Sequence, residues 1–246
     1  MSRTVKWIIG IVVGGVVAVF GGAYVYTHFI ENPPPELSFD DLGGGSTTTT
    51  DGSGGGEATT TTAGDDGGGE STGSAGSYVV ASDSQVGYRV SEVLFGSDTE
   101  AVGRTGDITG GIELDGSTVT TASFEVDMTT VASDRSQRDG QFRGRIMSTD
   151  QFPTATFELS EPIDLGDLPA EGDEVTVSAT GDLTLRGVTN SVTFDLTARL
   201  VDGNVQISAQ IPLDFDAFEI PDASGGPAQV GRDGTLEVLL DLEPAS

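Results

Sequence analysis

The stretch Val192-Thr-Phe194-Asp-Leu196-Thr-Ala198-Arg-Leu200 alternates apolar and polar residues from end to end. Side chains of a β-strand point to opposite faces in turn, so this stretch has one apolar and one polar face. Similar alternation recurs about eight times between Val86 and Glu243, without a long helical period. We therefore predict an all-β domain in which eight antiparallel strands curl into a closed or nearly closed barrel with apolar faces inward.

The predicted strands are separated by residues typical of tight turns, such as Asp115-Gly116 and Asp202-Gly203-Asn204. Glycine and asparagine tolerate the positive φ that hairpins need, and short gaps favour antiparallel neighbours. Residues 134–147 break the alternation and predict a short helical insert that closes one end of the barrel. A barrel of this size can hold a small apolar ligand. The predicted strands are 86–94, 106–114, 118–128, 154–160, 174–183, 190–200, 204–213 and 235–243.

Composition divides the 246 residues into four segments. Residues 1–6 form a basic tail, and 7–30 form an uncharged apolar run. As a helix this run spans about 36 Å, against roughly 30 Å of hydrocarbon core, which predicts a transmembrane anchor. The positive-inside rule places the tail in the cytoplasm. The linker, 31–77, and the barrel domain, 78–246, are then extracytoplasmic, and the protein is a single-pass protein of the cell membrane.

Two features of the N-terminal half admit alternatives. A cleaved signal peptide competes with the anchor, but the apolar run is long and ends in Tyr-Val-Tyr-Thr-His-Phe-Ile, which favours an uncleaved anchor. Gly10-x-x-x-Gly14 is compatible with a homodimer, although glycine is also simply common in membrane helices. The 47 linker residues are rich in Gly, Thr, Ser and acids, which predicts a disordered tether about 35–40 Å long.

Charge and missing residue types exclude several functions. The formal net charge is −28, and the barrel domain holds nine arginines, no lysine and 30 acids, which excludes a nucleic-acid partner. Cysteine is absent and the only histidine is His28, so His- and Cys-based catalysis and metal sites are not expected in the domain. The many acids are interpreted as solvated surface, and neither a metal site nor a carboxylate-type enzyme is expected.

Four of the nine arginines of the domain lie in a single 11-residue stretch inside the predicted insert. One interpretation is that they pair with surrounding acids and fix the insert in place. The other is that they form a site for an anionic or polar headgroup at the mouth of the barrel, since guanidinium groups suit phosphate and carboxylate. The four are Arg135, Arg138, Arg143 and Arg145.

Three motifs follow one another in the domain. They are Ser133-Asp-Arg-Ser-Gln-Arg138-Asp139-Gly-Gln-Phe142, Phe152-Pro153-Thr-Ala-Thr-Phe157 and Gly181-Asp-Leu-Thr-Leu-Arg-Gly187-Val-Thr189. Together they resemble the signature of the YceI-like polyisoprenoid-binding family, over essentially all of 78–243. A His-x-G found in many members is replaced here by Glu92-Val-Leu-Phe95-Gly96, so the identity of the ligand is not carried over.

The resemblance implies a lipocalin-like barrel that carries a long isoprenoid or similar amphiphile outside the cytoplasm. A barrel without reactive groups, tethered to a membrane, is also suited to lipid, because a buried tail gains roughly 0.8 kcal/mol per methylene. We therefore expect a non-catalytic protein that stores or transports a long-chain lipid ligand, a polyprenyl lipid or isoprenoid quinone, and requires no cofactor. The alternative is a surface interaction module whose barrel is filled.

The residues expected to line the ligand site are large apolar side chains on inward faces of the predicted strands and their ends. For each of them ordinary core packing is the competing interpretation. They are Tyr88, Val90, Phe95, Ile112, Phe124, Val126, Phe157, Leu183, Leu185, Phe194, Leu196, Ile207, Phe215 and Phe218.

Overall fold

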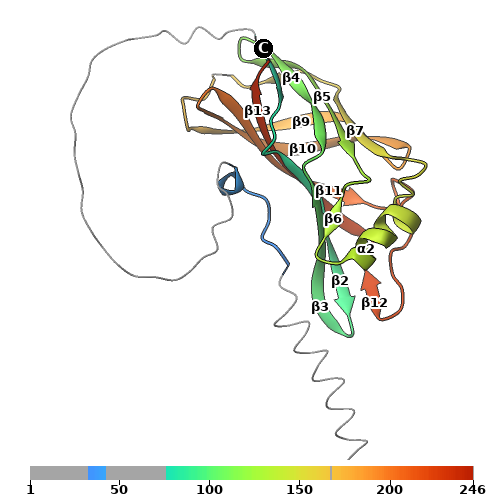
Figure 1. Ribbon diagram of the computed structural model, residues 1–246. Helices are drawn as coiled ribbons and strands as arrows, with labels where there is room; N and C mark the ends of the chain where they lie inside the picture. The colour runs from blue at the N-terminus through green and yellow to red at the C-terminus, as the bar shows by residue number, and fades with distance from the viewer. Residues whose placement is uncertain (1–32, 43–75, 167, 246) are drawn as a thin grey trace, which may run out of the picture.

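The computed structural model describes residues 33–42, 76–166 and 168–245 (Figure 1). The predicted anchor, its Gly10 and Gly14, and most of the predicted linker lie outside these residues. Within the described ranges, no helix combines the length and the apolar character needed to cross a bilayer.

The described strands form one antiparallel sheet that closes into a barrel, as the alternation predicts. Strand β1 closes it, because it pairs with β4 on one side and with β13 on the other. The strands are β1 (Gly76–Val80), β2 (Gln85–Leu94), β3 (Ser97–Thr105), β4 (Ile108–Asp115), β5 (Thr118–Asp127), β6 (Ala132–Ser133), β7 (Thr154–Leu159), β8 (Ile163–Asp164), β9 (Glu174–Leu185), β10 (Val188–Val201), β11 (Asn204–Asp214), β12 (Ala228–Val230) and β13 (Asp233–Pro244).

The barrel wall has eight strand positions, here called staves. Two of the staves are bent, and each of these consists of two consecutive strands. β1 and β2 pair with successive parts of β13, and β3 and β4 return antiparallel to them. The other staves are β5, β7, β9, β10, β11 and β13, in that order around the wall. The short strands β6, β8 and β12 lie beside β3, β5 and β2.

Two strands differ from the sequence prediction. The alternation predicted neither β1 nor β3. Between 94 and 118 it predicted one strand, at 106–114, which corresponds to β4, beginning at Ile108. β3 carries no large apolar side chain on its inward face, where Ala101 and Thr105 line the interior. Gly103 is small because the Tyr88 ring lies across it: a Cβ there would come within 2.5 Å of the ring. A strand whose neighbour fills its space with an aromatic ring has no hydrophobic period of its own.

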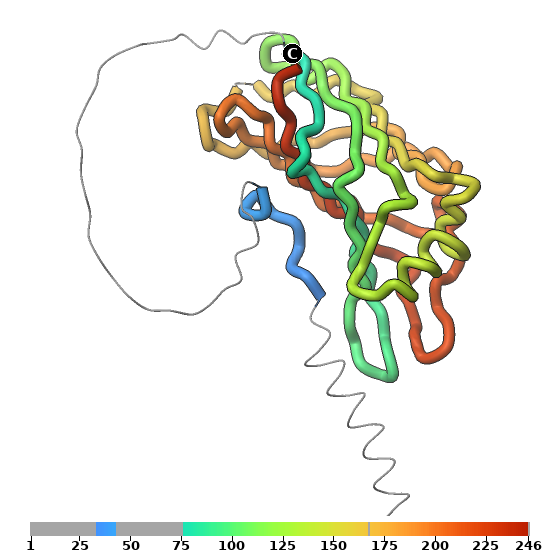
Figure 2. Tube along the Cα trace, viewed as in Figure 1, coloured from blue at the N-terminus to red at the C-terminus, as the bar shows by residue number. Residues whose placement is uncertain are grey.

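The insert is helical, as predicted. It comprises α2 (Ser136–Gln141) and a π-helical turn, η3 (Phe142–Ile146). It lies at the end of the barrel from which the β2–β3 hairpin projects (Figure 2). Phe142 is buried and its ring stacks on Tyr88 of β2, with 5.2 Å between the centroids, so the insert is fixed to the wall by aromatic packing.

Residues 33–42 form a segment, here called the strap, that crosses the outside of the barrel. It ends in the 3-10 turn η2 (Phe39–Asp41), which lies against β11. The sequence predicted disorder throughout 31–77, and this stretch differs because it contains the large apolar residues of that linker, Leu37, Phe39 and Leu42. Leu37 is only 4% exposed, and since ten residues cannot bury it among themselves, the barrel wall covers it.

Candidate functional site

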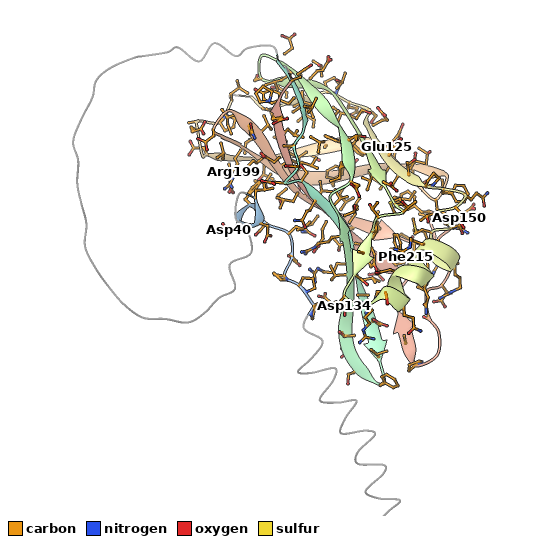
Figure 3. All side chains as sticks on the ribbon, in the orientation of Figure 1. Asp40, Glu125, Asp134, Asp150, Arg199 and Phe215 are labelled. Carbon is orange, nitrogen blue, oxygen red and sulfur yellow. The ribbon has the colours of Figure 1, made fainter. Side chains whose placement is uncertain are left out.

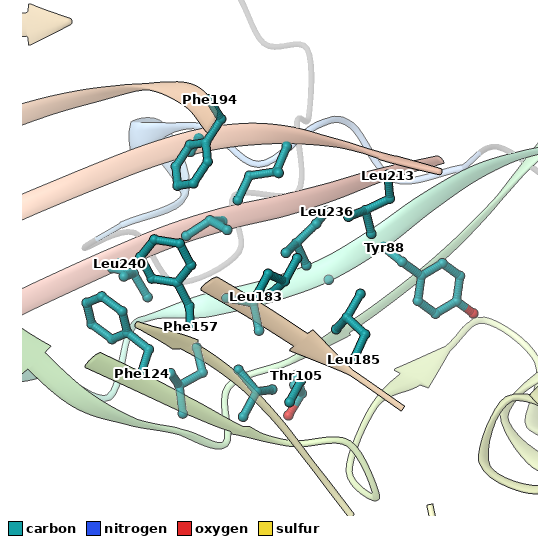
Figure 4. A pocket seen from close by; sticks show the side chains of 18 of the residues that line it. Tyr88, Thr105, Phe124, Phe157, Leu183, Leu185, Phe194, Leu213, Leu236 and Leu240 are labelled. Carbon is teal, nitrogen blue, oxygen red and sulfur yellow. The ribbon is translucent and has the colours of Figure 1, made fainter. Parts of the chain in front are cut away.

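The barrel encloses a cavity of about 690 Å³. Every stave contributes to its wall, and most of the lining side chains are aliphatic or aromatic (Figure 4). The volume falls within the roughly 300–1,000 Å³ of typical small-molecule sites. The interior is therefore hollow, and its side chains do not meet in the middle.

Strand alternation explains how the wall is built. On β2 every second residue from Val86 to Leu94 lines the cavity, and of the residues between them only Gly87, which has no side chain, does so as well. The long aromatic side chains come from different staves: Phe157 on β7 meets Phe194 on β10 edge to face, 5.7 Å apart. Gly181 on β9 makes room for Phe157, because a Cβ at that position would lie 2.4 Å from its ring.

Most of the residues expected to line a ligand site do face the cavity. Twelve of them do so from the wall or its ends: Tyr88, Val90, Ile112, Phe124, Val126, Phe157, Leu183, Leu185, Phe194, Leu196, Ile207 and Phe215. This places them in one continuous apolar surface, which is the arrangement that a ligand site requires.

The other two expected residues differ: Phe95 also lines the cavity, but from a turn, whereas Phe218 does not line it. Phe95 sits at the tip of the β2–β3 hairpin with a φ of 51°, lines the cavity from there, and is 62% exposed. Phe218 is 3% exposed and belongs to a packed cluster with Leu213 and Ile220, which line the cavity although Phe218 itself does not. Both lie in turns, where the two-residue period that assigns a face does not apply.

The four arginines of the insert separate into two pairs. Arg135 and Arg138 line the cavity, whereas Arg143 and Arg145 do not. Arg143 donates to the carbonyl of Val131 at 3.3 Å, and Arg145 donates to the carbonyls of Asp222 and Ala223. The second pair therefore holds the insert against neighbouring loops.

A small polar group stands at the hairpin end of the cavity. Arg138 forms ion pairs with Glu92, at 3.3 Å, and with Asp134 of its own insert. Glu92 is 8% exposed and occupies an inward position of β2, two residues after Val90. Burial raises the pKa of the nearby Tyr88 to about 12, so its hydroxyl keeps its proton at physiological pH.

Sequence reasoning missed several lining residues. Leu236, Val238 and Leu240 line the cavity from β13, and the alternation on that strand could have found them. Glu92 could have been found from the same period on β2, but a charged residue at an inward position is against expectation. The small lining residues, such as Ala122 and Ala179, carry no signal in the sequence.

The arrangement offers apolar burial and a few hydrogen-bonding groups at one end. Within the residues that the structure describes, no group of three or more acids is placed to hold a metal ion. Two acids of the acid-rich region 164–174 instead accept from backbone N–H groups of turns: Asp164 from Gly166, at 2.8 Å, and Glu171 from Asp202.

A family model described as the YceI-like domain matches residues 78–242. The chain belongs to the YceI-like family. The match covers the described barrel from β1 to β13 and excludes the strap and everything before it. No curated protein matches the sequence.

The solved structures that are similar to this chain include proteins from three organisms. A polyisoprenoid binding domain from Saccharophagus degradans, implicated in plant cell wall breakdown, is 17% identical, with a TM-score of 0.57 over 70% of this chain and 100% of its own. BcnA from Burkholderia cenocepacia is 19% identical, with a TM-score of 0.48 over 63% of this chain and 95% of its own. The YceI protein of Campylobacter jejuni is 14% identical, with a TM-score of 0.43 over 56% of this chain and 83% of its own. At these identities the likeness of the first to this YceI-like barrel concerns the fold.

Proposed function

We propose that this protein binds a polyisoprenoid or similar long-chain amphiphilic lipid inside its barrel, and stores or transports it without catalysis. The observation that carries the proposal is the cavity of about 690 Å³ with a wall of aliphatic and aromatic side chains. Transfer of hydrocarbon from water to such a space stabilises a complex by roughly 0.8 kcal/mol per methylene, less the cost of ordering the chain.

The cavity volume sets the length of tail that fits. At about 30 Å³ for each water-sized group, 690 Å³ holds about 23 carbon-sized groups. With five carbons in an isoprene unit, this corresponds to about four or five units. A polyprenyl lipid or an isoprenoid quinone with a tail of four or five units therefore fits with most of its tail inside the cavity. A longer tail extends out of the cavity.

The polar end of the cavity favours an uncharged head. Arg138 lies between two carboxylates, those of Glu92 and Asp134, so its charge is already balanced. A phosphate at this position would have to compete with both. The protonated hydroxyl of Tyr88 and the amides of Gln137 and Gln141 remain suited to hydrogen bonding with a hydroxyl or carbonyl head.

The proposal places the barrel outside the cytoplasm, tethered to the membrane through residues 7–30. The support is the length and apolar character of that segment in the sequence and the basic residues that precede it. A tethered carrier has its lipid source within reach. The homodimer suggested by Gly10 and Gly14 belongs to the same segment and stays a prediction.

The rival function is a surface interaction module with a filled barrel. The hollow interior favours the carrier, because a barrel that serves only as a rigid scaffold gains stability from a packed core. The experiment that separates the two is extraction of the purified full-length protein with organic solvent and identification of the released lipid by mass spectrometry.

The same experiment has a second arm in which delipidated protein is offered a polyprenol, an isoprenoid quinone or a polyprenyl phosphate. We expect uptake of one equivalent of the first or second, and weaker uptake of the phosphate. Absence of co-purified lipid together with absence of uptake would remove the proposal. Preferential uptake of the phosphate would overturn only the assignment of the head.

A further inference from the structure

The strap (33–42) is bound to the outer wall of the barrel by arginines. The carbonyl of Pro34 accepts a hydrogen bond from Arg89 of β2, at 2.8 Å, and the carbonyl of Pro35 accepts one from Arg104 of β3. Further along, Phe39 lies under the guanidinium of Arg199 on β10, whose carbon is 4.2 Å from the ring centroid. The strap thus crosses the wall from β3 to β10 (Figure 3).

The arginines that hold the strap are themselves fixed. Glu237 on β13 is fully buried, and its two carboxylate oxygens accept from Arg89, at 2.7 Å, and from Arg104, at 2.9 Å. Arg89 also pairs with Glu100 at 2.7 Å. Because both guanidinium groups are held in position by carboxylates, their remaining N–H groups point at the strap without further ordering.

The position of the strap divides the predicted tether into two unequal parts. Residues 31–32 join the predicted anchor to the strap, and residues 43–75 connect the strap to β1 of the same barrel. Three steps of about 3.8 Å separate Ile30 from Pro33, so the strap begins within about 11 Å of the end of the predicted anchor. The 33 residues from 43 to 75 come after the strap in the sequence, so they do not lengthen the connection between the predicted anchor and the strap.

One exposed aromatic side chain lies in the turn between the two strands to which the strap is bound first. Phe95 stands at the tip of the β2–β3 hairpin, six residues beyond Arg89, which is about 20 Å along a strand. Of the large hydrophobic residues exposed within the described ranges, Val79, Phe95 and Leu168, it is the most exposed and the one in this hairpin. Its backbone N–H is bonded to the carbonyl of Pro227, and both residues reach the rim of the cavity.

We propose that the strap holds the barrel against the membrane with the β2–β3 hairpin toward the bilayer, and that Phe95 contacts the lipid surface. The cavity end bordered by Phe95 and Pro227 then faces the lipid phase, so a tail passes between membrane and barrel without crossing water. The partner is a zwitterionic bilayer, since the acidic domain repels an anionic one. This inference rests on the membrane anchor of the proposed function.

The test uses the absence of cysteine, which allows a single fluorophore to be attached at a chosen position. Full-length Ser97→Cys and Asp115→Cys proteins are labelled and reconstituted into phosphatidylcholine vesicles with a quencher in the headgroup region. Ser97 follows the hairpin tip, and Asp115 ends β4 at the opposite end of the barrel. We expect quenching at 97 to exceed quenching at 115 several-fold.

A second variant releases the strap and leaves the barrel intact. Leu37→Asp places a charge at a buried position of the strap, whereas Glu36→Ala changes its exposed neighbour and serves as the matched control. Leu37→Asp should bring the two quenching values close together, and Glu36→Ala should leave them apart. Equal quenching in the parent, or an unchanged difference in Leu37→Asp, would overturn the proposal.

Polyprenol uptake measured on the same samples separates this inference from the proposed function. Uptake without a quenching difference overturns the placement alone. A quenching difference without uptake overturns the carrier function and supports the placement. Protein that fails to float with the vesicles overturns the anchor and therefore the placement with it.

Discussion

Ala122→Phe, a substitution on the inner wall, tests whether the cavity itself sets the length of the bound tail. Ala122 lies on β5 opposite Ile112 of β4, and both side chains face the cavity. Phenylalanine adds six carbon atoms there. The neighbouring Thr121 is exposed on the other face of the same strand, so Thr121→Phe is a matched control that adds a larger side chain outside.

The magnitude follows from the volume. The parent cavity of 690 Å³ holds about 23 carbon-sized groups at about 30 Å³ each, and six added carbons reduce this to about 17. The affinity of a prenol series should rise with chain length and level off at these limits. For a tail that fills the parent cavity, the variant loses at most about 5 kcal/mol, from six groups at about 0.8 kcal/mol each.

The assay is displacement of a fluorescent fatty probe by prenols of increasing length. In the parent we expect affinity to level off at about four or five isoprene units, and in Ala122→Phe about one unit earlier. Prenols short enough to fit both cavities should bind both proteins alike, and Thr121→Phe should behave as the parent. The same loss for short and long prenols in Ala122→Phe, or a common limit in all three proteins, would refute the reasoning.

Three further predictions concern the wall. Because the pKa of Tyr88 is raised to about 12, the folded protein keeps a proton that the unfolded chain loses above pH 10. The free energy of unfolding should therefore fall by about 1.4 kcal/mol per pH unit from pH 10 to about 12 and then level off. Denaturation measured against pH checks this, and Tyr88→Phe should lack the slope. Glu237→Ala removes the buried carboxylate that pairs with Arg89 and should lower the free energy of unfolding by about 3 kcal/mol. A loss below about 1 kcal/mol, which is typical of a surface ion pair, would contradict this prediction. Gly181→Ala should cost about 1–3 kcal/mol because its Cβ displaces the Phe157 ring toward the cavity, and an unchanged melting temperature would show that the ring is not held there.

Much of the barrel could be predicted because its strands carry their own period. On β10 the inward positions Phe194, Leu196 and Ala198 line the cavity and alternate with polar residues, so the inward face of this strand is visible in the sequence. β3 could not be predicted, because its inward positions hold only small side chains beside Tyr88. A single strand does not reveal the size of the residue that its neighbour presents to it.

The candidate site divides in the same way. The apolar wall followed from alternation, whereas Phe218 was wrongly assigned to it because it lies in a turn, where no period assigns a face. The pairing of Arg138 with Glu92 joins residues 46 positions apart, and no local pattern announces it. The sequence could place the arginines in the insert, but not say which of them reach the cavity.

By itself the sequence determined which faces of the strands are apolar, how many staves the barrel has, and where the helical insert begins, since these depend on neighbours within a few positions along the chain. Only the tertiary structure decided that the barrel is hollow and that residues 33–42 lie against its wall. Both depend on distances between side chains that are far apart in the chain: cavity volume is the space left after opposite walls are packed, and the strap is held by arginines more than fifty residues away.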